Sequence, residues 1–128
     1  MRRYWLAVFG AAILVSQVAL FSLVGVPQHV GWTVAALLCF GLAGAAFVVA
    51  GVREYLPLAS AAAPWYRFAG VGDLLLALGM FLNGVSMVRG DESTVFVGLI
   101  AAAGGLVLAA IGVDYLRGGV HLDTSVVQ

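Results

Sequence analysis

The run Trp32–Val52, WTVAALLCFGLAGAAFVVAGV, decides the fold of this chain because it carries no charged side chain along its whole length. An α-helix rises 1.5 Å per residue, so this run would extend about 30 Å, the thickness of the hydrocarbon core of a bilayer. Lipid offers no hydrogen bonds to the backbone, and a helix satisfies its own N–H and C=O groups. The alternating pattern of a transmembrane β-barrel strand is missing.

Three further apolar runs of similar length flank this one on both sides. The sequence therefore predicts an all-α integral membrane protein, a bundle of four transmembrane helices that forms a single domain over residues 1–128. The predicted spans cover about residues 4–26, 32–52, 68–88 and 95–115, and residues 116–128 form a tail. Ser93 and Thr94 come directly before the last span, where either side chain could cap the helix.

Composition agrees with a membrane environment and excludes several other classes of protein. Hydrophobic residues make up 63% of the chain and charged residues only 9%, whereas a soluble domain carries about 25% charged residues. No cluster of basic residues could follow a phosphate backbone, so we expect no nucleic-acid partner. Cys39 is a lone cysteine, and His29 and His121 fall in opposite aqueous flanks, so we expect no metal and no cofactor.

The basic residues predict the orientation of the four spans. Arg89 flanks one membrane face, and the other arginines flank the opposite face: Arg2, Arg3, Arg53, Arg67 and Arg117. Short cytoplasmic loops carry an excess of basic residues, so both termini are predicted to be cytoplasmic in the cell membrane. Most of the aromatic residues typical of a membrane interface gather at the same face: Tyr4, Trp5, Tyr55, Trp65, Tyr66 and Tyr115.

Two spans leave the membrane through similar sequences. Residues 50–56 read AGVREYL and residues 111–116 read IGVDYL, which align if one residue is skipped. Two tandem helical hairpins of the same orientation, produced by an internal duplication, would explain the match. The alternative is that a glycine, an acid and a tyrosine are simply a favourable way for a helix to leave a bilayer.

Small residues predict where the helices pack. Lipid gives little hydrophobic gain for helix association, so close backbone approach at glycine and alanine matters more. The second span carries Gly41 and Gly44, and the fourth span carries Gly98, Gly104 and Gly105. We expect these faces to pack inside the monomer or between copies of the chain.

Three polar side chains inside the spans are candidates for a function or for interhelical pairing. Asp73 is the charged residue that lies within a span, about 9 Å along the helix from Arg67. A membrane carboxylate is costly and commonly functional, but Asp73 could also form a structural pair with Arg53 or Arg117. Gln17 and Asn83 lie at similar depths, and their amides could hydrogen-bond between helices.

Two functions compete on these observations. The scarcity of polar residues in the spans favours a non-catalytic helical module: an accessory or structural subunit of a membrane complex, or a homo-oligomeric bundle. Its partners would be the lipid bilayer and either itself, as a homo-oligomer, or another membrane protein. The alternative is a small proton-coupled transporter or channel that uses Asp73. No nucleophile–base pair or phosphate loop is visible in the sequence, so we expect no enzyme activity.

The arginine asymmetry makes the orientation testable. Reporters of membrane side fused to the N-terminus and to the C-terminus are both expected to report a cytoplasmic location. Reporters found on opposite sides of the membrane would mean that the number of spans is odd and would refute the predicted topology.

Overall fold

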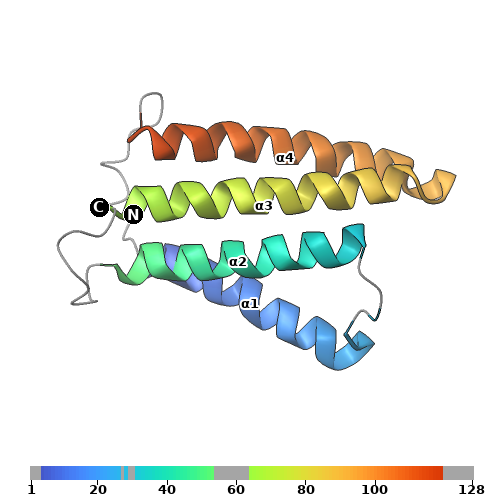
Figure 1. Ribbon diagram of the computed structural model, residues 1–128, viewed down its shortest axis with the longest axis horizontal. Coiled ribbons are helices and arrows are strands. Elements are labelled where there is room, and N and C mark those ends of the chain that lie inside the picture. Colours follow the sequence, from blue (N-terminus) through green and yellow to red (C-terminus); the bar gives the residue numbers. More distant parts are fainter. Residues whose placement is uncertain (1–3, 27, 29–30, 54–63, 120–128) are drawn as a thin grey trace.

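The computed structural model describes residues 4–26, 28, 31–53 and 64–119, which form four long α-helices (Figure 1). The helices are α1 (Tyr4–Val24), α2 (Trp32–Val52), α3 (Trp65–Val88) and α4 (Val95–Leu116), and a short 3₁₀ helix η1 (Glu92–Thr94) precedes α4. All four are long and apolar enough to cross a membrane. The predicted all-α architecture with four such helices is confirmed. Arg2, Arg3, His29, Tyr55, His121 and the tail from residue 120 lie outside the described residues.

Two helix boundaries differ by two or more residues from the sequence prediction, and backbone chemistry explains both. The first helix ends at Val24 because Gly25 takes a left-handed conformation with φ +88°, which stops an α-helix. The third helix begins at Trp65, earlier than expected, because Pro64 occupies its N-cap position. Proline lacks an N–H and suits the start of a helix, and its carbonyl accepts a hydrogen bond from the Arg67 N–H at 3.1 Å.

The turn between α3 and α4 does not use the predicted side-chain cap. Thr94 occupies the N-cap position of α4 but makes no capping hydrogen bond to that helix. Its Oγ1 instead lies 2.8 Å from the carbonyl oxygens of Met87 and Asp91. The hydroxyl therefore satisfies an acceptor at the end of α3, and it ties the turn together.

Successive helices run in opposite directions and lie side by side in chain order (Figure 1). The extensive interhelical contacts join α1 to α2, α2 to α3, and α3 to α4. We call the end where α1 begins and α4 ends the terminal end, and the opposite end the distal end. The arrangement is a row of antiparallel helices in which α3 has a close neighbour on each side.

The contact between α3 and α4 is built from glycine and alanine along its whole length. Three layers pair Gly70 with Gly112, Ala77 with Gly105, and Gly84 with Gly98. A Cβ added at Gly70 would lie 2.8 Å from the Gly112 carbonyl oxygen, and one added at Gly105 would lie 2.8 Å from that of Ala77. On each helix, the residues of successive layers are seven positions apart. A seven-residue repeat keeps the same faces of two helices in contact when the pair forms a left-handed supercoil.

Phenylalanine and glycine form the contact between α2 and α3. The Phe40 ring lies against Gly79 and the Phe47 ring against Gly72, again with a spacing of seven residues on each helix. Phe47 is buried, and its ring also meets Phe9 of α1 edge to face. Bulky rings over bare backbone let these helices interlock although they approach less closely than α3 and α4.

The first helix is attached along only part of its length. Near the terminal end, Gly10 packs against the Gly44 backbone, and Gly51 packs against Ala7. Toward the distal end, α1 diverges from α2 (Figure 1). The structure describes the whole of α1, and Gly10 is the one buried residue in this helix. Gly41 and Gly44 of the sequence prediction thus lie at the α1–α2 contact, where Gly41 meets the Gln17 side chain.

Two adjacent glycines of α4 provide a matched test of the α3–α4 contact. In Gly105→Ala the new Cβ would meet the rigid Ala77 backbone, so we expect the free energy of unfolding to fall by about 1–3 kcal/mol. In Gly104→Ala the nearest atom, at 3.1 Å, is the Met80 methyl, which ends a flexible side chain, so a much smaller effect is expected. Unfolding in detergent titrations would measure both variants, and equal effects would contradict this packing.

Candidate functional site

Gln17 of α1 bridges to α2 near the point where these two helices begin to separate. Its Nε2 donates a hydrogen bond to the Leu37 carbonyl of α2 at 2.6 Å. A Cβ on Gly41 would lie 2.9 Å from Gln17 Oε1, so the absence of a side chain at Gly41 makes room for this amide. A hydrogen bond between helices in a membrane contributes about 0.6 kcal/mol, and up to about 2 kcal/mol. Gln17 therefore acts as a tie between α1 and the α2 backbone.

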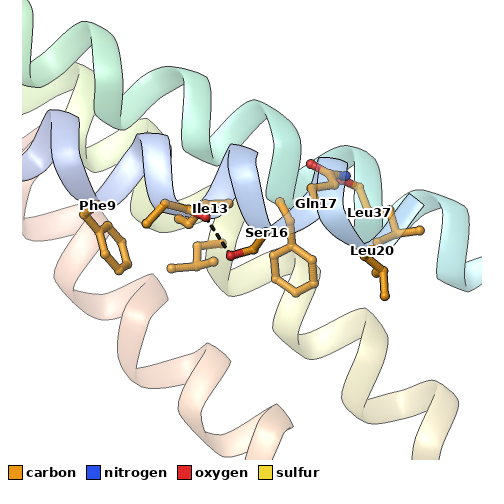
Figure 2. Close-up of a pocket in the computed structure, with 9 residues that line it drawn as sticks. Phe9, Ile13, Ser16, Gln17, Leu20 and Leu37 are labelled. Atoms are coloured by element: carbon orange, nitrogen blue, oxygen red, sulfur yellow. Dashed lines mark hydrogen bonds between the residues drawn. The ribbon is translucent and has the colours of Figure 1, made fainter. Parts of the chain in front are cut away.

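Apolar cavities lie on both sides of this tie. One, of about 430 Å³, is bounded by α1, by Leu37 and Phe40 of α2, and by Leu76 of α3. Figure 2 shows Phe9, Ile13, Ser16 and Leu20 of α1 along this cavity. The second, of about 460 Å³, extends toward the distal end beside Phe21 and Val34. In a bilayer, both are open to lipid chains.

The serines of α1 do not add a polar site to these cavities. The Ser16 hydroxyl donates to the Ala12 carbonyl at 2.7 Å (Figure 2), and the Ser22 hydroxyl donates to the Val18 carbonyl at 2.9 Å. Both hydroxyls thereby use their hydrogen on a backbone carbonyl of their own helix, as serine commonly does in transmembrane segments. Gln17 is the polar side chain that both cavities share.

Asp73 lies inside the protein, on the α4 side of α3. Its side chain is 7% exposed, and its Oδ2 has no hydrogen-bond partner. It follows Trp65 by eight positions, or about 12 Å along the helix axis. Its Cβ would lie 3.1 Å from a Cβ added at Gly112, so the small size of Gly112 makes room for the aspartate.

A second buried carboxylate accompanies Asp73 at the terminal end. Asp114 of α4 is 6% exposed and makes contacts of its own, so it is not free. Both carboxylates lie within electrostatic reach of the Tyr115 hydroxyl, and the Tyr115 ring packs edge to face on Trp65. The sequence pattern places Asp114 at the end of a span and does not predict its burial. The seven-residue glycine repeat that ends at Gly112 was the signal that could have revealed it.

Asn83 carries an amide at membrane depth that the fold leaves exposed. Its Nδ2 reaches only the Met87 sulfur, at 3.9 Å, which is a weak contact. Gln17 and Asn83 do not bond to each other as the sequence suggested, because Gln17 donates to the α2 backbone. Spacings of three and four residues place Asn83 on the same side of α3 as other residues. We call those of them that are half-buried or exposed the open stripe: Leu76, Met80, Asn83 and Met87.

Comparison with known proteins places this chain in a group but gives it no activity. The chain belongs to DUF7994, a family of unknown function. The family model matches residues 1–128. No curated protein and no solved structure matches the chain. Any functional conclusion therefore depends on the polar groups described above.

The chemistry available at these positions is hydrogen bonding and proton binding. Within residues 4–26, 28, 31–53 and 64–119, no three His, Cys, Asp or Glu side chains gather in a way that could hold a metal ion. Cys39 is a half-buried free thiol on α2. The structure thus brings Asp73, Asp114 and Tyr115 together at the terminal end, while Gln17 and Asn83 lie on separate helices with separate partners.

Proposed function

We propose that this protein is a non-catalytic helical module of the cell membrane that assembles with further copies of itself. The exposed amide of Asn83 is the observation that carries this proposal. An amide within the hydrocarbon region loses its hydrogen bonds to water, and each unsatisfied group there costs several kcal/mol. A second protein surface that covers Asn83 would remove that cost.

The chemistry of an amide favours a second copy of the chain as the partner. Asparagine carries both a donor and an acceptor, so two Asn83 side chains related by a two-fold axis could each donate to and accept from the other. The neighbours of Asn83 on the open stripe, Met80 and Met87, have flexible side chains that adapt to a packed surface. A different membrane protein that supplies a polar side chain at this depth is the other partner compatible with this face.

The row of helices also supports an assembling module. The helix α1 has a single buried residue, and large apolar side chains are exposed along α1 and α4. The two cavities beside Gln17 are lined chiefly by apolar side chains, and Asp73 lines neither of them. These surfaces fit contact with lipid and with other helices better than they fit a water-filled passage. We also propose the N-in, C-in orientation, which the terminal reporters described above would test.

Substitution of Asn83 tests self-assembly directly. Asn83→Leu is expected to weaken self-association by about 0.6–2 kcal/mol, roughly 3- to 30-fold, because the interhelical amide bonds are lost. Asn83→Gln keeps the amide and should retain most of the association. Single-molecule photobleaching in lipid vesicles, as a function of protein density, would measure the dissociation constants.

Ser22→Ala provides the matched control, because Ser22 is an exposed membrane serine that already bonds to its own backbone. It should leave the association constant unchanged. A protein that stays monomeric in vesicles at all densities would refute self-assembly. Crosslinking in native membranes that captures one defined partner through position 83, and no second copy, would replace the homo-oligomer with an accessory subunit.

A second candidate function is a proton-coupled transporter or channel, and the buried, unpartnered Oδ2 of Asp73 favours it. Buried carboxylates in membrane spans commonly form part of proton relays. Here Asp73 would bind a proton on one side of the membrane and release it on the other, while a substrate moves.

The expected outcome for this second function is that Asp73→Asn abolishes proton-driven uptake in proteoliposomes, because asparagine cannot release a proton. Asp91→Asn changes an exposed aspartate in the turn after α3 and should leave uptake intact. Uptake that persists in Asp73→Asn would remove this mechanism.

A further inference from the structure

The terminal end of the α3–α4 contact combines close backbone packing with buried acidic side chains. Gly70 and Gly112 form the layer nearest this end, and a Cβ added at Gly112 would lie 2.9 Å from the Gly70 carbonyl oxygen. Asp73 is one turn away on α3, and Asp114 and Tyr115 follow Gly112 on α4. Two carboxylates that are each more than nine-tenths buried therefore lie near this end of the helix pair.

No neighbouring group among the described residues forms a hydrogen bond with the Oδ2 atom of Asp73. It is buried, and no donor reaches it. The titratable groups of α4 near this end are Asp114 and Tyr115, which supply negative charge and a phenol rather than a cation. Arg67 on α3 and Arg117 after α4 are exposed. The described part of α1 has no charged residue, and α2 has none before Arg53, which has contacts of its own.

The available space restricts what could satisfy this oxygen. The Asp73 Cβ lies so close to Gly112 that a Cβ there would be only 3.1 Å away. A metal ion would need several protein ligands, and no three His, Cys, Asp or Glu side chains of the described residues gather to hold one. A proton needs only one lone pair on one oxygen, and it converts an unpaired buried charge into a neutral group.

We propose that Asp73 Oδ2 is a reversible proton-binding site that controls how tightly α3 and α4 pack at the terminal end. On binding, a hydronium ion transfers its proton to the Oδ2 lone pair, an O–H bond forms, and water is released. The neutral carboxyl stays enclosed beside Gly112. Loss of the proton leaves an ionised carboxylate without a counter-charge, which draws water into the contact and separates Gly70 from Gly112.

This inference goes beyond self-assembly, and it shares only Asp73 with the second candidate function. Transport would need the proton to leave toward the opposite side of the membrane, whereas the packing control needs exchange with one side. A protein that binds a proton at Asp73 and moves no substrate would remove the transporter and leave the present inference standing.

Infrared spectroscopy of the full chain in lipid vesicles tests the proton site. With carbon-13-labelled aspartate, a protonated carboxyl band is expected to appear and disappear reversibly with pH. The band should be missing in Asp73→Asn and should persist in Asp114→Asn. A spectrum without a titrating band, or one in which the band survives in Asp73→Asn, would overturn the proposal.

Spin-label distances test the consequence for packing and do not depend on that band. Val71 and Val113 are exposed residues near the terminal end of α3 and α4, so labels there should not disturb the contact. In a Cys39→Ala background, the distance distribution between them is expected to broaden as the proton is lost, and Asp73→Asn should stay narrow. A pair at Leu78 and Leu106, nearer the middle of the helices, should change less. Distributions unaffected by pH in the unsubstituted Asp73 protein would refute the coupling.

Discussion

The close approach of the α3 and α4 backbones is the interaction on which the rest of the structure depends. In a bilayer, apolar side chains gain little by leaving lipid for a helix contact, so dispersion between closely fitted surfaces must hold the helices together. Paired glycine and alanine layers supply that fit over the whole length of the hairpin. The same layers place Asp73 beside Gly112, so the packing that joins the helices also encloses this acid.

The polar side chains at membrane depth are satisfied to different degrees. The two serines of α1 bond to their own helix, and Gln17 reaches across to the α2 backbone. Asn83 is exposed with only a sulfur partner, and Asp73 is enclosed with one oxygen unpaired. Because lipid cannot compensate either of the last two, they are the positions where a partner or a proton changes the free energy most.

The two hairpins resemble each other in sequence more than in packing. The α3–α4 pair is in contact along its whole length, while α1 and α2 meet near the terminal end and then diverge (Figure 1). Gly10 and Gly51 allow the close part, and no glycine layer continues it beyond Gln17 toward the distal end of the described α1. An internal duplication remains a prediction, but its two halves would have taken separate roles, one as a rigid pair and one with apolar cavities beside its polar tie.

The sequence alone determined that four helices form and approximately where each one lies. An uninterrupted apolar run of this length can satisfy its backbone in only one way within lipid, so local composition was sufficient. Gly25 and Pro64 also encode the two boundaries that the apolar runs misplace. Only the tertiary structure decided which polar groups are paired, because this depends on the rotation of each helix about its axis and on its neighbour. Because of that rotation, Asp114 is buried, Gln17 donates a hydrogen bond to the Leu37 carbonyl, and Asn83 is exposed. Hydropathy cannot specify such rotation, since an apolar helix can present any of its faces to lipid at nearly the same cost.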